Sequence, residues 1–356
     1  MTKSIKGISK RVVYFDYLRI AAIIAVVVLH VASSNWYVTD VNSLQWNSFN
    51  IYDSLMRWGV PIFVMISGAL FLDREQSLSK LYKKNILRIL IILIIWTIIN
   101  SVWQLFTTDS INSFRDFVTN LFTGPYYLWF LYMLIGLYMV TPFLKRIVEN
   151  KKTMRYFLLL AFLFTFLIPE LIQIVALKSE LAAGLINDKL DMMRLFMVLG
   201  YTGYFVLGYF LSKSTVKGKA EVAIYILGIL GAIFTIVSTA LLSNYKGVAD
   251  ALFYNNLTVN VLSMSVAVFV LFKNHIYKAC SRECGNRFWQ LISRCSLGVY
   301  LVHLIVLESL DLCFGLNSLS LNPIVSVPLV AGAVLVISYT ISIVVYKIPK
   351  IGKWIM

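Results

Sequence analysis

The first apolar stretch of the chain contains an arginine and a histidine, Arg19 and His30, separated by ten apolar residues. In an α-helix eleven positions amount to about three turns, so both side chains lie on one face, about 16 Å apart along the axis. Ionisable side chains inside a membrane helix cost free energy and usually mark substrate pathways or proton relays. We therefore expect this guanidinium and imidazole to face one hollow and to act on a substrate there.

Each member of the pair also has a purely structural explanation. Asp16 lies one turn before Arg19 and could form an ion pair with it near the membrane surface. Arg19 could also extend its guanidinium to the interface, and His30 could hydrogen-bond to a neighbouring helix. Because the two residues share a face across an apolar run, we favour a functional role for both.

Arg57 is a second charged residue inside an apolar stretch. If that stretch enters the membrane from the outside, Arg57 lies at about the depth of His30, and the two side chains could converge in one pocket. The alternative is an ion pair between Arg57 and Asp53, four residues earlier. Ser67 follows in the same stretch, where a small residue would also serve close helix packing.

A later apolar stretch contains Ser296, Tyr300 and His303, which share one helical face. His303 lies near the middle of the membrane and needs a polar partner there, so we weigh a structural and a functional role equally. Glu308 follows toward the outer surface. It could bind a polar substrate or simply end the span.

The composition predicts the fold class. Hydrophobic residues make up 59% of the chain and charged residues 14%, whereas about 25% of the residues in soluble domains are charged. We therefore predict an all-α polytopic membrane protein with about ten transmembrane helices, formed by apolar stretches long enough to cross a bilayer. They cover approximately residues 14–34, 54–72, 86–106, 126–144, 156–176, 194–212, 222–242, 255–272, 295–314 and 324–346.

The distribution of positive charge predicts the orientation. Of the 32 Lys and Arg residues, 25 lie at the termini and near one set of predicted loops, and 5 lie near the opposite set. This asymmetry places both termini and the basic loops in the cytoplasm, and it supports an even number of spans. Orientation and anionic lipid explain the net charge of +15. Nucleic-acid binding is a poor interpretation, because the basic residues are scattered over short loops.

We predict that residues 1–356 form a single membrane domain without a cleavable signal peptide. The longest outward loops are predicted at about 35–53, 107–125, 177–193 and 243–254. Cys280 and Cys284 have the spacing of half a metal site, but the sequence offers no second half, so we expect free thiols and no bound metal.

The candidate residues also lie in segments that match a known pattern. These are Arg19 with His30, Arg57 to Gly68, Tyr127 to Pro142, Tyr204 to Leu211, and Ser296 to His303. In order and placement they resemble the acyltransferase-3 family of bacterial membrane acyltransferases, which includes enzymes that O-acetylate surface polysaccharides and peptidoglycan. The arginine–ten residues–histidine spacing resembles the family's first-helix motif, and ten helices is its usual core.

The resemblance implies a multi-pass enzyme of the bacterial plasma membrane. It would move an acyl group, by default acetyl, from cytoplasmic acyl-CoA to a hydroxyl of an extracytoplasmic or lipid-linked glycan, with no bound cofactor. Arg19, with Asp16, would bind the donor. His30 would act as general base or transient acyl carrier, and Arg57 would stabilise the developing oxyanion or orient His30. Three further candidates complete the predicted site: His303, Ser67 and Glu308.

Two other interpretations stay open. A transporter or flippase for a polar lipid or glycan would also use arginine and histidine inside the membrane. Against it, the chain has no inverted repeat and no glycine-broken helices in matching halves. A relative that has lost catalysis and acts as a sensor is a third interpretation, and the presence of Arg19, His30 and Arg57 argues against it.

Overall fold

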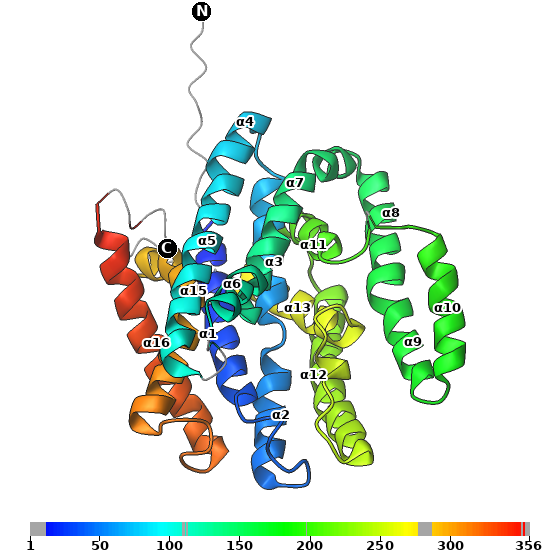
Figure 1. Ribbon diagram of the computed structural model, residues 1–356. Coiled ribbons are helices and arrows are strands. Elements are labelled where there is room, and N and C mark those ends of the chain that lie inside the picture. Colours follow the sequence, from blue (N-terminus) through cyan, green and yellow to red (C-terminus); the bar gives the residue numbers. More distant parts are fainter. Residues whose placement is uncertain are drawn as a thin grey trace, which may run out of the picture.

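The structure is a computed structural model that describes residues 12–108, 111, 113–196, 198–276, 287–349 and 352. Within these residues all regular elements are helical, as the sequence predicts (Figure 1). Cys280 and Cys284 lie outside the described residues. In chain order the elements, with η for short 3₁₀ or π segments, are α1 (Tyr14–Ser33), α2 (Leu44–Met56), α3 (Gly59–Phe71), α4 (Leu78–Lys80), η1 (Leu81–Ile86), α5 (Leu87–Thr107), α6 (Phe114–Thr123), η2 (Tyr126–Leu128), α7 (Trp129–Glu149), α8 (Lys151–Ala161), η3 (Phe162–Leu167), α9 (Ile168–Ala176), α10 (Glu180–Met192), α11 (Thr202–Lys213), α12 (Lys219–Lys246), η4 (Leu252–Tyr254), α13 (Val259–Leu271), η5 (Phe272–Ile276), α15 (Arg287–Phe314) and α16 (Pro323–Lys347).

Nine helices in the described part of the chain are long and apolar enough to cross a membrane, some of them built from consecutive elements. They coincide with nine of the ten predicted stretches. The stretch predicted at 156–176, for example, contains Pro169 but forms one continuous helical run through α8, η3 and α9. The predicted class, an all-α polytopic membrane protein, is therefore confirmed.

The stretch predicted at 194–212 differs from this expectation. It is helical only from Thr202 onward, in α11. Arg194 has a φ of 52° and Gly200 a φ of 71°, and such positive angles do not occur inside a right-handed helix. With 12 residues, α11 is too short to cross a bilayer alone.

Three of the four predicted outward loops contain all or most of an α-helix that the sequence did not predict there. The segment 107–125 contains α6, the segment 177–193 contains α10, and the segment 35–53 contains most of α2. Side chains set the starts of these helices: the Ser113 hydroxyl accepts the N–H of Asp116 at 3.1 Å at the start of α6. Apolar length alone could not predict these helices, because they are short and partly polar.

The α2–α3 pair is interrupted at Arg57 and Trp58, between two helices of 13 residues each. Pro61 has no N–H to donate to the carbonyl of Arg57, so the regular hydrogen-bond pattern cannot continue through this point. The pattern resumes where the N–H of Ile62 donates to the carbonyl of Trp58 at 3.1 Å. Arg57 therefore lies at a helix end inside the bundle.

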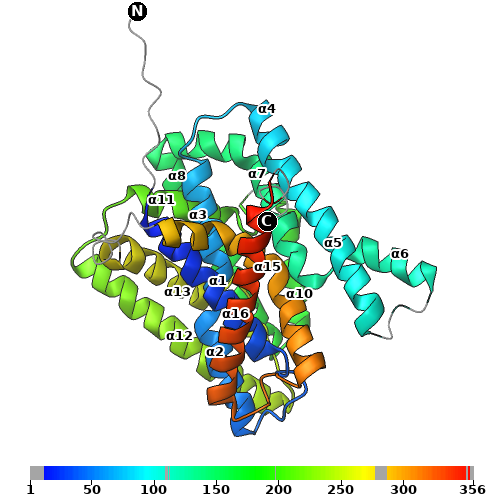
Figure 2. The same cartoon turned by 90° about the vertical axis from the view of Figure 1, so that its left-hand side faces the viewer.

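Helix α1 lies at the centre of the bundle, in contact with α2, α3, α15 and α16. In Figure 1 the start of α1, the α4 segment and the end of α16 lie toward the upper face, and the start of α2 and the α9–α10 turn lie toward the lower face. Figure 2 shows α6 extending sideways from the end of α5. We call the upper face the basic face, because the loops predicted to be cytoplasmic lie there.

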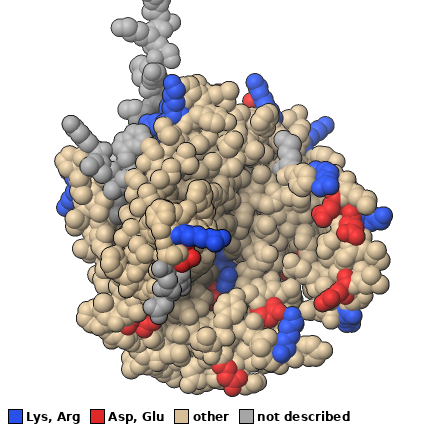
Figure 3. Space-filling model, in the orientation of Figure 1, with Lys and Arg blue, Asp and Glu red and all other residues tan. Residues whose placement is uncertain are grey.

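The surface between the two faces is suited to lipid. Large apolar side chains of the outer helices are exposed, among them Ile229 and Leu230 on α12 and Val336 and Val344 on α16. Uncharged side chains cover most of the face in Figure 3. This arrangement fits helices that border the hydrocarbon of a bilayer.

Candidate functional site

Two cavities lie one after the other along α1. The Arg19 cavity, of about 310 Å³, is lined by residues of α1, α3, α5, α7 and α15, including Arg19 and Val26. The His30 cavity, of about 580 Å³, is lined by Leu29 and His30 together with residues of α2, η2, η4 and α15. Helix α1 thus contributes to both cavities, and the change from one to the other occurs within about one turn.

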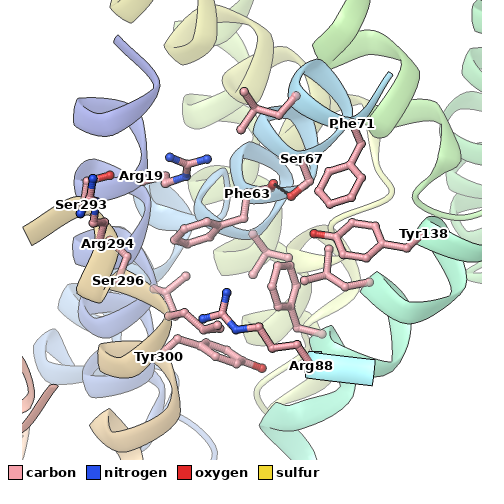
Figure 4. Close-up of a pocket in the computed structure, with 16 residues that line it drawn as sticks. Arg19, Phe63, Ser67, Phe71, Arg88, Tyr138, Ser293, Arg294, Ser296 and Tyr300 are labelled. Atoms are coloured by element: carbon pink, nitrogen blue, oxygen red, sulfur yellow. Dashed lines mark hydrogen bonds between the residues drawn. The ribbon is translucent and has the colours of Figure 1, made fainter. Parts of the chain in front are cut away.

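The Arg19 cavity has arginines from three helices in its wall, Arg19 of α1, Arg88 of α5 and Arg294 of α15. Figure 4 shows Arg19 at the upper left of the cavity and Arg88 at its lower side, with the side chains of Ser67 and Tyr138 to the right of Arg19. Much of the remaining lining is apolar. Guanidinium groups bind phosphate well, so this cavity suits a ligand with anionic and apolar parts.

The predicted pair of Asp16 and Arg19 is present. The Oδ1 atom of Asp16 lies 3.5 Å from Nη1 of Arg19, and the hydroxyl of Ser293 donates to the same oxygen at 2.8 Å. Asp16 is buried, whereas the Arg19 side chain is 31% exposed. Asp16 therefore links the start of α1 to α15 and holds Arg19 at the wall of its cavity.

A third cavity, here called the loop cavity, has a volume of about 390 Å³. It adjoins the Arg19 cavity, because Phe71 lines both. Its wall includes Arg74, Lys145 and Arg146. Lys145 lies 2.7 Å from the carboxylate of Glu75, and its hydrogen bond lowers the pKa of that exposed carboxyl. Cationic side chains thus extend from the Arg19 cavity toward the basic face.

The His30 cavity brings together His30 and Arg57, along with Tyr126 and Glu308. His30 is half-buried, and its ring centroid lies 5.0 Å from that of His303 and 6.1 Å from that of Tyr126. Among the described residues, the His30 ring has no hydrogen-bond partner. Its nitrogens are therefore open to a ligand in the cavity.

Arg57 is held by two neighbours. Its Nη2 lies 2.5 Å from Oδ2 of Asp53, and its Nη1 donates to the carbonyl of Tyr254 at 3.3 Å. The guanidinium also lies 4.0 Å from the centroid of the Tyr254 ring. The pairing with Asp53, the structural alternative for Arg57, is thus present. Arg57 still lines the cavity and is 18% exposed.

The three further candidates lie in different surroundings. Ser67 lines the Arg19 cavity. His303 is fully buried beside His30. Glu308 lines the His30 cavity and accepts a hydrogen bond of 2.7 Å from the indole nitrogen of Trp103, which ties α15 to α5.

The single hollow predicted for Arg19 and His30 is not what the described residues form, because the two side chains line different cavities. Val26 and Tyr300 line the first cavity, and His30 and Leu304 line the second. The partition therefore spans about one helical turn, or about 5 Å, on both α1 and α15. The cause is packing, since the apolar residues of α1 between Arg19 and His30 are largely buried against neighbouring helices.

Sequence reasoning did not select Arg88, Arg294 or Tyr126, all of which line a cavity. Arg88 and Arg294 were counted among the cations of the basic loops. Their positions in the sequence could have marked them as candidates. Arg88 falls inside the stretch predicted at 86–106, and Arg294 directly precedes the stretch predicted at 295–314. Tyr126 had no signal beyond that of an interfacial aromatic residue.

Comparison of the sequence with known families gives a match. A family model described as an acyltransferase domain matches residues 12–344, nearly the whole chain. The comparison with curated proteins and the comparison with solved structures find no match. The matched segment includes all residues that line the Arg19, His30 and loop cavities.

Proposed function

The chain belongs to the acyltransferase-3 family, and from this premise we propose that it transfers an acyl group, by default acetyl, from acyl-CoA to a hydroxyl of a glycan. The observation that carries the proposal is the succession, along one helix, of a cavity lined by three arginines and a cavity lined by a half-buried imidazole. The first suits a phosphorylated thioester, and the second suits an acceptor that must lose a proton. Donor and acceptor would meet at the partition.

The donor enters from the basic face, which we place in the cytoplasm of a bacterial plasma membrane. Arg74, Lys145 and Arg146 of the loop cavity attract the charged end of the donor. Arg19 and Arg88 then contact a phosphate or the polar part of the arm. The acceptor, an extracytoplasmic or lipid-linked glycan, enters the His30 cavity from the opposite face.

In the transfer step, a nitrogen of neutral His30 accepts the proton of the acceptor hydroxyl while the oxygen attacks the thioester carbonyl carbon. The carbon–sulfur bond then breaks, and the thiolate takes the proton from the His30 imidazolium. Arg57, fixed by Asp53, stabilises the negative charge that develops on the carbonyl oxygen. A transient acyl-histidine is the alternative course, in which His30 attacks first and the acceptor hydroxyl attacks second.

The acyl carbon must pass the partition before it can react. The partition spans about one turn of α1 and α15, and Val26 and Tyr300 lie on its donor side. We propose that side chains at the partition move to connect the two cavities during transfer. We therefore place the opening between Val26 and Tyr300.

The proposal is tested by adding acetyl-CoA labelled in the acetyl group to membranes with and without the protein, and then to the purified protein with the acceptor found in membranes. We expect protein-dependent transfer of label to a glycan and a matching release of free coenzyme A. A transporter would move a glycan across vesicles without consuming acetyl-CoA. Glycan movement with no use of any acyl-CoA would therefore replace the proposal by the transporter interpretation.

Arg19 gives a test of the donor site. We expect Arg19→Gln to raise the KM for acyl-CoA by roughly 10- to 100-fold, because a hydrogen bond to a charged group contributes about 1.5–3 kcal/mol, and to leave the KM for the acceptor unchanged. Steady-state kinetics with each substrate varied in turn measures this. Arg155→Gln, an exposed arginine of α8, is the matched control. An Arg19→Gln variant with the donor KM of Arg155→Gln would remove Arg19 from the donor site.

A further inference from the structure

We infer that His303 is a positioning residue for His30: its Nε2 accepts a hydrogen bond from the N–H of the His30 ring, so that the other His30 nitrogen is presented to the acceptor hydroxyl. The inference rests on the proposed function of His30. It assigns a role to a fully buried imidazole that touches neither substrate in the proposed mechanism.

The tautomer of His303 follows from its hydrogen bond. Its Nδ1 lies 2.6 Å from the carbonyl oxygen of Tyr300, one turn earlier on α15. A carbonyl oxygen can only accept, so Nδ1 must carry the hydrogen. In a neutral imidazole the other nitrogen, Nε2, then has a lone pair and acts as an acceptor.

The Nε2 atom of His303 is buried and has no hydrogen-bond partner among the described residues. A buried acceptor without a donor is destabilising relative to a satisfied one. His303 itself is 0% exposed, so bulk water does not reach it in this arrangement. An N–H group that moved onto this nitrogen would therefore be stabilised.

The His30 ring is the neighbour that can supply such an N–H. Its centroid lies 5.0 Å from that of His303, closer than the rings of Tyr127 at 5.9 Å and Tyr300 at 6.0 Å. The hydroxyl of Tyr127 already donates to the carbonyl of Leu301 at 3.1 Å, and the hydroxyl of Tyr300 donates to the carbonyl of Tyr127. A rotation of the His30 ring within its cavity would complete the pair.

Each acidic residue of the His30 cavity already has a partner at one of its carboxylate oxygens. Asp53 holds Arg57 through Oδ2, Glu308 accepts from Trp103, and Asp311 accepts from Asn317. His303 therefore has the role that an acidic residue often has beside a catalytic histidine, which is to fix the ring and its tautomer. Because the partner is neutral, the paired His30 stays a neutral base until it takes the acceptor proton.

Two polar substitutions separate positioning from packing. In His303→Asn the amide lies where Nδ1 was, so the bond to the Tyr300 carbonyl is kept and the acceptor near His30 is lost. In His303→Gln the amide reaches the position of Nε2 and keeps an acceptor there. We expect Asn to lower kcat by roughly 10- to 100-fold with both KM values unchanged, and Gln to restore most of the rate.

Several outcomes of that comparison overturn the inference: wild-type kcat in His303→Asn, equal losses in Asn and Gln, or a loss confined to KM. Thermal melting of both variants shows whether the bundle is intact, and equal melting temperatures are expected. A wild-type protein with no transfer activity would instead contradict the proposed function, and the pairing would then be decided by the next measurement.

Nitrogen-15 spectra of protein labelled at histidine test the pairing without any reaction. The chain has three histidines, so each ring is assigned by its disappearance in one substitution variant. We expect His303 to carry its hydrogen on Nδ1, and the N–H signal of His30 to shift in His303→Asn but not in His303→Gln. A hydrogen on Nε2 of His303 would refute the inference. So would a His30 N–H signal whose chemical shift is the same in both variants as in the wild type.

Discussion

Replacing His30 by alanine is expected to abolish acyl transfer, with a fall in kcat of about 10²- to 10⁴-fold, the usual contribution of a positioned proton-transfer group. The acceptor hydroxyl would lose its base, and no other histidine lines the His30 cavity among the described residues. Transfer of labelled acetyl from acetyl-CoA, followed at saturating concentrations of both substrates, measures the loss. Donor binding is expected to persist, because the Arg19 cavity is intact.

The stability of His30→Ala should be close to that of the wild type. His30 is half-buried and faces a cavity, and its ring makes no hydrogen bond in the described structure, so the only bond at stake is the one inferred with His303. His275→Ala is the matched control, because His275 lies in η5 and pairs with Glu221 at 2.7 Å, outside both cavities along α1. Full activity in His30→Ala, or an equal loss in His275→Ala, would end the assignment of His30 as base.

Features fixed by local sequence were predictable. Helix α1 begins and ends within one residue of the stretch predicted at 14–34, because membrane thickness sets the length of an apolar run. The pairs Asp16–Arg19 and Asp53–Arg57 also follow from local spacing, since residues three or four apart meet on a helix. These pairs form as the spacing indicates.

Features set by tertiary packing were not predictable. The division between the Arg19 and His30 cavities depends on which residues of α15 lie against α1. The sequence of α1 alone does not determine this packing. The approach of His30 to His303 joins positions far apart in sequence for the same reason. The backbone turns at Arg194 and Gly200 shorten α11, although the residues between them are apolar in sequence.

The second large effect is expected on the melting temperature, where α3 and α11 cross with their backbones in contact. A Cβ at Gly208 would lie 2.0 Å from the carbonyl oxygen of Met65, and a Cβ at Gly68 would lie 1.8 Å from the carbonyl oxygen of Phe205. The contact is reciprocal: Gly208 of α11 faces a carbonyl of α3 three residues before Gly68, and Gly68 faces a carbonyl of α11 three residues before Gly208. At such contacts only backbone movement can make room, and helix pairs that approach this closely depend on glycine.

We expect Gly208→Ala to lower the melting temperature by about 4 °C or more, because so close a carbonyl contact puts the overpacking cost at about 3 kcal/mol or more, and the unfolding entropy of a chain of 356 residues is large. Gly68→Ala should act similarly, and it should also raise the donor KM, because the neighbouring Ser67 lines the Arg19 cavity. Thermal unfolding of the purified protein and donor kinetics measure the two effects.

The controls for this crossing are two other helical glycines. A Cβ at Gly136 of α7 or at Gly332 of α16 would meet no atom within 4 Å. Alanine there should keep or slightly raise the melting temperature, since alanine favours a helix by about 0.5–1 kcal/mol over glycine. If Gly208→Ala and Gly68→Ala have the same melting temperatures as these controls, α3 and α11 do not cross at backbone contact. Some contact other than this crossing would then hold Ser67 at the Arg19 cavity.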